Sequence, residues 1–234
     1  MLPVADQNIP GRGFAVVTLT LIAINVIVFV LLQLPNEAFT YGWAAVPREI
    51  TTGMDILGPV TIGGETIILE PGPSPIQLTL LSSMFMHGGW LHLGGNMLFL
   101  WIFGDNVEHT VSPIVYLVFY LVAGMVGSLA QVMIEPNSFV PSLGASGAIS
   151  GVLAAYLVLF PSNRVLVYVF YSALWVPALL VIGLWAVLQF IGGIGQIAVT
   201  EQTGGVAYAA HIGGFLTGLV FGLGARAFIR RRSY

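Results

Sequence analysis

The sequence predicts an all-α membrane protein, and three observations carry that prediction. The chain has 234 residues, of which 57% are hydrophobic and only 7% are charged, whereas a soluble domain carries about 25% charged residues. Long apolar stretches are separated by short polar turns, as in polytopic helical proteins. These stretches also lack the alternating polarity of transmembrane β-strands. No linker divides the chain, so we expect one domain over residues 1–234.

Six membrane helices are expected. The first, at about 14–34, is too long for the apolar region of a signal peptide and indicates a retained anchor. A Pro- and Gly-punctuated segment at 35–77 carries apolar patches suited to the membrane interface. The remaining helices are expected at about 78–103, 114–134, 146–160, 176–191 and 206–229.

The connections between these helices also have distinct characters. The charged turn GDNVEH at 104–109 is expected to end the second helix. The stretch that follows PSNR at 161–164 is longer than a bilayer requires, and we expect an interfacial lead-in there. A Gly-rich loop is expected at 192–205, ahead of the last helix.

The helix expected at 146–160 is short. Its 15 residues span about 22 Å at about 1.5 Å per residue, whereas the bilayer core is about 30 Å thick. One end must therefore begin below the membrane surface. Non-helical backbone at that depth is tolerated only inside protein or beside water, which predicts a wet cavity with Ser146 at its floor.

The arginines predict the orientation of the helices. With six helices, both termini share one side of the membrane with the turns at 104–113 and 161–164, and only Arg48 lies on the other side. The positive-inside rule places the termini in the cytoplasm and opens the cavity outward. The absence of a targeting leader favours a prokaryotic plasma membrane. The six arginines on the cytoplasmic side are Arg12, Arg164, Arg226, Arg230, Arg231 and Arg232.

Composition and motifs exclude several classes of function. The chain has no cysteine, which rules out disulfides, thiol catalysis and Cys-ligated zinc. The terminal arginine triplet follows an apolar helix, so it indicates orientation in the membrane and no nucleic-acid partner is expected. There is no H-E-x-x-H motif and no carboxylate lies close in sequence to His87 or His92, so no metal is expected.

Ser146 lies in GASGA at the start of the short helix. Gly144 and Gly147 let other backbone approach closely, and Gly144 can adopt unusual backbone angles. Free N–H groups at a helix N-terminus favour negative charge, as an oxyanion site requires. The alternative is that Ser146 only caps the helix.

His211 lies in AHIGGFLTG at the same expected depth as Ser146. Gly214, Gly218 and Gly222 follow it as one stripe of small residues, which favours close packing of membrane helices. The short helix carries a matching stripe. If the stripes face each other, the imidazole comes within reach of the serine and can activate it as a base. The alternatives are ordinary packing for the stripes, and ligand or proton binding for the histidine. The matching stripe consists of Ser146, Ser150, Gly151, Ala154 and Ala155.

His92 and Asn96 are four residues apart, so they share one face of a helix. Side-chain donors aimed at an oxyanion are worth about 10²–10³ in rate each. His87 fits that face less well and is expected to support the site from its outer end, or to be an interfacial histidine near Trp90. No carboxylate is well placed as a third member, so a Ser–His pair oriented by packing is expected.

These residues carry a resemblance to the rhomboid intramembrane serine proteases, from about residue 14 to the C-terminus. The matching motifs are H-x-x-x-N at 92–96 preceded by His87, G-x-S-G at 144–147, and A-H-x-x-G-x-x-x-G at 210–218. Weaker similarities are VPREI, GNMLFLWIFGDNVE and VPALLVIGLWAVLQ. In one departure, some members carry an aromatic residue one turn after the nucleophile, packed against the histidine, where this chain has Ser150.

The resemblance implies a six-helix rhomboid-type bundle in the lipid bilayer, with a short central helix that starts at a submerged serine. It implies a dyad of Ser146 and His211, an oxyanion site formed with His92 and Asn96, and no cofactor. Substrates would be transmembrane proteins cut in or near their membrane segment at small residues, admitted past the helix at 176–191 and the loop at 192–205. Supporting roles fall to His87, Gly144, Gly147, Gly214 and Gly218.

Two other classes of function compete with an endopeptidase. A catalytically inactive relative that binds membrane proteins is expected to have lost Ser146 or His211, and both are present. A transporter is expected to show inverted repeats or paired interrupted helices, and the two halves of this chain do not resemble each other. The endopeptidase is therefore favoured.

Overall fold

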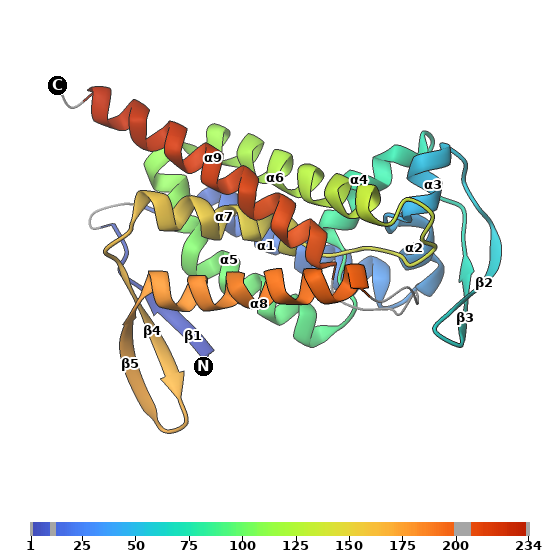
Figure 1. Ribbon diagram of the computed structural model, residues 1–234, viewed down its shortest axis with the longest axis horizontal. Helices are drawn as coiled ribbons and strands as arrows, with labels where there is room; N and C mark the ends of the chain where they lie inside the picture. Colours follow the sequence, from blue (N-terminus) through green and yellow to red (C-terminus); the bar gives the residue numbers. More distant parts are fainter. Residues whose placement is uncertain (1, 10–12, 199–206, 233–234) are drawn as a thin grey trace.

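The computed structural model describes residues 2–9, 13–198 and 207–232 as a bundle of long helices with a small β-sheet at each end (Figure 1). The first long helix is α1, which continues into a π-helix, η1. The long helices are α1 (Val16–Ile27) with η1 (Val28–Gln33), α5 (Trp90–Val111), α6 (Pro113–Ile134), α7 (Ser146–Leu159), α8 (Ala178–Ala198) and α9 (Tyr208–Arg232).

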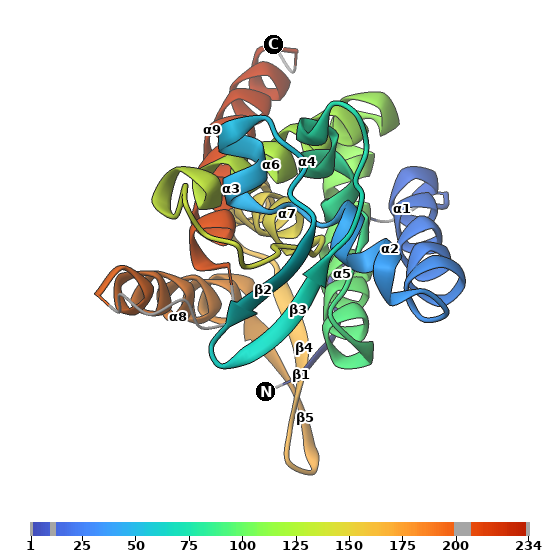
Figure 2. The same cartoon turned by 90° about the vertical axis from the view of Figure 1, so that its right-hand side faces the viewer.

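Helix α7 occupies the centre of the bundle. Figure 2 looks along it and shows α5, α6, α8 and α9 around it. Its residues from Gly147 to Tyr156 are all buried. This burial follows from the sequence, because a helix that is apolar on all sides is stable only where other elements surround it.

Helix α5 runs through the charged turn that was expected to end it. It continues to Val111, because the carboxylate of Glu108 is buried against the start of α1. That carboxylate accepts hydrogen bonds from the backbone N–H groups of Val17 and Thr18, at 3.0 and 2.8 Å. The first N–H groups of a helix have no partner within the helix. Glu108 therefore caps α1, and the expectation of a helix end at 104–109 was wrong.

The same helix starts later than expected. Residues 76–85 form only short helical turns, which are η2 (Ile76–Leu78, 3₁₀), α4 (Thr79–Ser82) and η3 (Ser83–Phe85, 3₁₀), and α5 itself begins at Trp90. Gly89, which precedes α5, has a φ of 157°. The interruption at residues 86–89 places His87 and Gly88 in non-helical backbone rather than on the helix of His92.

Five short strands in the described residues depart from the all-α prediction. At one end of the bundle, β1 (Leu2–Asp6) pairs antiparallel with β4 (Arg164–Val169), which forms a hairpin with β5 (Ser172–Pro177). This hairpin occupies the stretch after 161–164 where an interfacial lead-in was expected, and its place at a membrane interface stays a prediction. Its sequence is rich in β-branched and aromatic residues, which favour strands, and Val165 and Val167 are fully buried. Helix α8 follows directly at Ala178.

The segment at 35–77 covers the opposite end of the bundle (Figures 1 and 2). It folds as two short helices and a hairpin, and the isolated bridge between Ala45 and Ser142 ties it to the loop before α7. Whether it lies at a membrane interface stays a prediction. Its elements are α2 (Glu37–Trp43), α3 (Pro47–Thr52), β2 (Gly58–Ile62) and β3 (Glu65–Leu69).

Among the described residues, three helical stretches are long and apolar enough to cross a membrane: 16–33, 113–134 and 208–231. Three shorter apolar stretches are 76–85, 146–159 and 178–193. The mostly helical, apolar bundle agrees with the predicted class of membrane protein. The expected number of six spans stays a prediction.

Candidate active site

Ser146 is the first residue of α7, as the sequence predicted, and the preceding backbone is shaped by Gly144. Gly144 has a φ of 133°, a backbone angle that residues with a side chain rarely adopt. A Cβ atom at this position would lie 2.9 Å from Cε1 of His92. Glycine is therefore required twice, for the turn into α7 and for the contact with His92.

Helices α7 and α9 pack backbone to backbone. A Cβ atom on Gly214 would lie 1.9 Å from the carbonyl oxygen of Gly147, and one on Gly218 would lie 2.0 Å from that of Gly151. Gly222 likewise lies against Ala155. The stripe of small residues after His211 thus faces α7, where it meets Gly147, Gly151 and Ala155.

This packing brings Ser146 and His211 together. Nε2 of His211 lies 2.7 Å from Oγ of Ser146. The other ring nitrogen, Nδ1, lies 2.6 Å from Oε1 of Gln189 on α8. His211 is only 8% exposed, so both contacts are shielded from bulk solvent. A serine hydroxyl beside a neutral imidazole is the arrangement of an activated nucleophile.

A cavity of about 580 Å³ opens at this pair, lined by the predicted oxyanion residues together with Ser146 and His211. Asn96 is 9% exposed, and its Nδ2 donor has no hydrogen-bond partner in the described part of the chain. Nδ1 of His92 accepts from the N–H of Gly88 at 3.3 Å. The remaining proton of a neutral His92 is then on Nε2, the atom beside Gly144.

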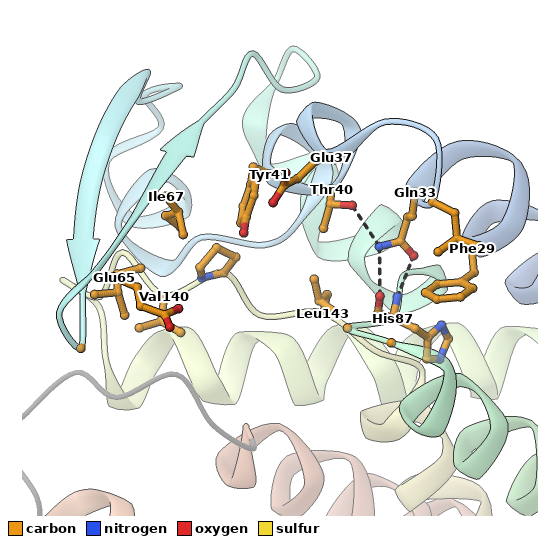
Figure 3. Close-up of a pocket in the computed structure, with 16 residues that line it drawn as sticks. Phe29, Gln33, Glu37, Thr40, Tyr41, Glu65, Ile67, His87, Val140 and Leu143 are labelled. Atoms are coloured by element: carbon orange, nitrogen blue, oxygen red, sulfur yellow. Dashed lines mark hydrogen bonds between the residues drawn. The ribbon is translucent and has the colours of Figure 1, made fainter.

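His87 lines a different cavity, of about 850 Å³, shown in Figure 3. The side-chain amide of Gln33, at the end of η1, bonds to both backbone groups of His87. Gln33 Nε2 donates to the His87 carbonyl oxygen at 3.2 Å, and the His87 N–H donates to Gln33 Oε1 at 2.8 Å. The His87 ring meets that of His92 edge-on, with centroids 5.2 Å apart. His87 therefore supports His92 from outside the cavity of Ser146.

The cavity of about 850 Å³ that His87 lines lies between the segment 35–77 and the loop before α7. Figure 3 shows Glu37 and Tyr41 on one side of it, Glu65 beside Val140 on a second, and Leu143 and His87 on a third. Burial, and then the neighbouring carboxylate of Glu37, raise the pKa of Tyr41 above its ordinary value. Three residues line both cavities, so the two adjoin: Gly88, Pro141 and Leu143.

Helix α8 supplies two contacts to His211 that sequence reasoning missed. Besides the hydrogen bond that Gln189 Oε1 accepts, the ring of Trp185 lies with its centroid 5.9 Å from the imidazole. The available signal was Gln189 itself, a polar side chain in an otherwise apolar membrane helix. Ser150, which stands where some relatives have an aromatic residue, is buried and donates to the carbonyl oxygen of Ser146 at 2.6 Å.

The loop expected at 192–205 is helical in its first part, because α8 extends to Ala198. Residues 199–205 lie outside the described residues, so their expected role in admitting a substrate stays a prediction. Within the described part of the chain, no three histidine, aspartate or glutamate side chains gather closely enough to hold a metal ion.

Comparisons with known proteins agree with the family resemblance that the sequence motifs carry. A family model for the Rhomboid domain matches residues 77–228. Rhomboid protein 1, mitochondrial, of Saccharomyces cerevisiae is 32% identical over 152 residues, covering 62% of this chain and 41% of that protein. Rhomboid protease GluP of Bacillus subtilis is 44% identical over 85 residues, covering 36% of this chain and 16% of that protein. Rhomboid-related protein 1 of Caenorhabditis elegans is 33% identical over 146 residues, covering 60% and 38%.

The match to the family model covers more than half of the chain, and the chain belongs to the rhomboid family. It spans less than half the length of each of these relatives, at 41%, 16% and 38%. The relatives include mitochondrial proteins. These mitochondrial relatives do not fit the expectation of a prokaryotic plasma membrane.

Proposed function

We propose that this chain is a serine endopeptidase that hydrolyses peptide bonds in or near the transmembrane segments of other membrane proteins. Ser146 is the nucleophile and His211 is the general base. His92, Asn96 and the N–H groups at the start of α7 stabilise the oxyanion. The observation that carries the proposal is the 2.7 Å contact between Ser146 and His211, in a cavity that also holds the unpartnered amide donor of Asn96.

The chemistry follows from these positions. His211 Nε2 takes the hydroxyl proton as Ser146 Oγ attacks the carbonyl carbon of the scissile bond. Charge develops on the carbonyl oxygen, where donors worth about 10²–10³ in rate each stabilise it. The imidazolium then gives its proton to the leaving amine, and the carbonyl stays on Ser146 as an ester. Water, activated by the same imidazole, hydrolyses the ester and frees the second product.

The membrane setting of the proposal rests on the apolar helices and on the family. Helix α7 has only 14 residues, so it spans about 21 Å at about 1.5 Å per residue, less than the bilayer core of about 30 Å. Ser146 then lies below the surface, and the cavity supplies the water that hydrolysis consumes. We place both termini on the arginine-rich side, and helix α8 at the side from which a substrate helix approaches.

Labelling with a fluorophosphonate probe tests the proposal directly. The wild type, Ser146→Ala and His211→Ala are purified in detergent and compared with Ser172→Ala, a matched control in β5 outside the cavity. The wild type and Ser172→Ala should be labelled and should cleave a model transmembrane substrate. Both site variants should do neither, while keeping the unfolding temperature of the wild type.

The alternative is a catalytically inactive relative that binds membrane proteins. A wild type that folds but is neither labelled nor able to cleave would favour this function and contradict the endopeptidase. Cleavage that persists in Ser146→Ala would contradict the assignment of the nucleophile.

A further inference from the structure

The imidazole of His211 is held at both nitrogens, and the second contact comes from outside the Ser–His pair. Oε1 of Gln189 lies 2.6 Å from Nδ1. An amide oxygen only accepts hydrogen bonds, so Nδ1 must carry the ring hydrogen of the neutral imidazole. Nε2 is then unprotonated and faces Ser146 Oγ at 2.7 Å. The bond to Gln189 therefore selects the tautomer that can accept the serine proton.

The orientation of the ring also depends on α8. Trp185 lies four residues before Gln189, so the two share one face of α8. The Trp185 ring contacts the imidazole at a centroid distance of 5.9 Å and an interplanar angle of 42°. On α7, the residue one turn after the nucleophile is Ser150, which is buried with its hydroxyl bonded to backbone. An aromatic contact to the histidine thus comes from α8 rather than α7.

In the part of the chain that the structure describes, no carboxylate in the cavity of Ser146 could take the place of Gln189 as the acceptor for Nδ1 of His211. Among the described residues that line the cavity of Ser146, none is acidic. Beside an imidazole that is only 8% exposed, a neutral amide oxygen orients the ring without the desolvation cost of a buried charge. Gln189 lines the same cavity, so it meets the imidazole where the reaction would take place.

We propose that Gln189 is a positioning residue that, together with Trp185, orients the imidazole of His211 for proton transfer. This inference rests on the proposed endopeptidase function. Both side chains belong to α8, so the alignment of the base depends on where α8 lies. A shift of α8 away from α9 removes the acceptor from Nδ1 and lowers the activity of the dyad, while the Ser146 and His211 backbones stay in place.

The test compares substitutions at adjacent positions of α8. Gln189→Met keeps the length of the side chain and removes the acceptor. Gln189→Glu keeps an acceptor oxygen in either protonation state. Leu188→Met is the matched control, because Leu188 is 55% exposed and does not line the cavity. For each variant, kcat and KM for a model transmembrane substrate are measured with the unfolding temperature and the rate of fluorophosphonate labelling.

Gln189→Met should lower kcat and the labelling rate about tenfold, the effect expected for one lost neutral hydrogen bond. Its KM and unfolding temperature should match those of the wild type. Gln189→Glu should restore kcat to within about threefold of the wild type, and Leu188→Met should change nothing. A packing role for Gln189 predicts a lower unfolding temperature or a higher KM at unchanged kcat, and either result overturns the inference.

Nitrogen NMR of ¹⁵N-histidine-labelled protein gives a readout that does not need a substrate. The wild type should show His211 protonated at Nδ1 and unprotonated at Nε2, and Gln189→Met should show a mixture of tautomers. A wild-type signal protonated at Nε2 overturns the inference alone. A folded wild type that neither labels nor cleaves overturns the proposed function, and this inference with it.

Discussion

Helices α8 and α9 both contribute to the surroundings of the Ser146–His211 pair, but they are held in different ways. Helix α9 packs along α7 through glycines, with gaps so small that one added carbon would overlap the facing carbonyl oxygens. Helix α8 lies at the edge of the bundle in both views (Figures 1 and 2) and leaves most of its long apolar side chains exposed. At Gly183 on α8, an added Cβ atom would meet nothing within 4 Å.

The difference separates two requirements of a Ser–His pair. The α7–α9 packing fixes where Ser146 and His211 stand, because it joins backbone to backbone. Helix α8 fixes how the imidazole is turned, through the side chains of Gln189 and Trp185. We therefore expect substitutions in the α7–α9 contact to affect stability, and substitutions on the His211 face of α8 to affect rate at unchanged stability.

The largest effect is expected in the α7–α9 contact. Gly218→Ala places a methyl group 2.0 Å from the carbonyl oxygen of Gly151. Overpacking of this kind costs about 1–3 kcal/mol or more, and backbone cannot yield as a side-chain end does, so we expect the upper end of that range. Thermal unfolding in detergent measures it. Gly224→Ala on the same helix meets no atom within 4 Å and should leave the unfolding temperature unchanged; equal losses in the two variants would refute the account of this contact.

A smaller effect, on rate alone, is expected at Trp185. Trp185→Leu removes the ring that contacts His211 and should lower kcat between about twofold and tenfold, in line with the value of an aromatic contact. The unfolding temperature should stay near that of the wild type. Trp101→Leu is the matched control, since Trp101 is 59% exposed on α5. If both variants lose stability and neither loses rate, α8 does not orient the base through this ring.

The smallest effect concerns the end of the bundle where α8 begins. Asp6 of β1 accepts hydrogen bonds from Tyr156 on α7 and Asn106 on α5, and β1 joins the sheet that leads into α8. Burial raises the pKa of Asp6 from 3.8 to about 6, even though both donors act to lower it. The folded state thus binds this proton more tightly than the unfolded state does, so stability falls as the pH rises from about 4 to about 6 and is level above.

Because Asp6 is only partly buried, we expect a change on the order of 1 kcal/mol across that range. Asp6→Asn keeps an acceptor and removes the titration, so its unfolding temperature should not fall across the same pH range. Unfolding curves at pH 4.5 and pH 7 make the comparison. A slope in Asp6→Asn equal to that of the wild type would show that another group titrates.

The same contrast explains what the sequence could predict. The stripe of small residues after His211 is a periodic signal, and it correctly indicated that α9 meets α7 with Ser146 close to the imidazole. The contact from Gln189 was missed because it depends on the rotation and tilt of α8 against α9, which no spacing within either helix specifies. The stripe of small residues predicted on α7 was also offset at its start, since Gly147 rather than Ser150 meets Gly214.

Two parts of the fold were mispredicted for a related reason. The charged turn at 104–109 did not end α5, because Glu108 bonds to the start of a helix some 90 residues earlier in the chain. The strand β4 was not foreseen because it is paired with β1, which lies far away in sequence near the N-terminus. In both cases a partner far along the chain decides the local structure, and a window of sequence around the segment does not contain that partner.

The most direct test of the central claim is to locate the residue that reacts with a fluorophosphonate. The labelled wild type is digested and the modified peptide is sequenced by mass spectrometry. The account predicts a single adduct on Ser146, which is lost in His211→Ala and formed more slowly in Gln189→Met. An adduct on another serine, or none on folded protein, would contradict it.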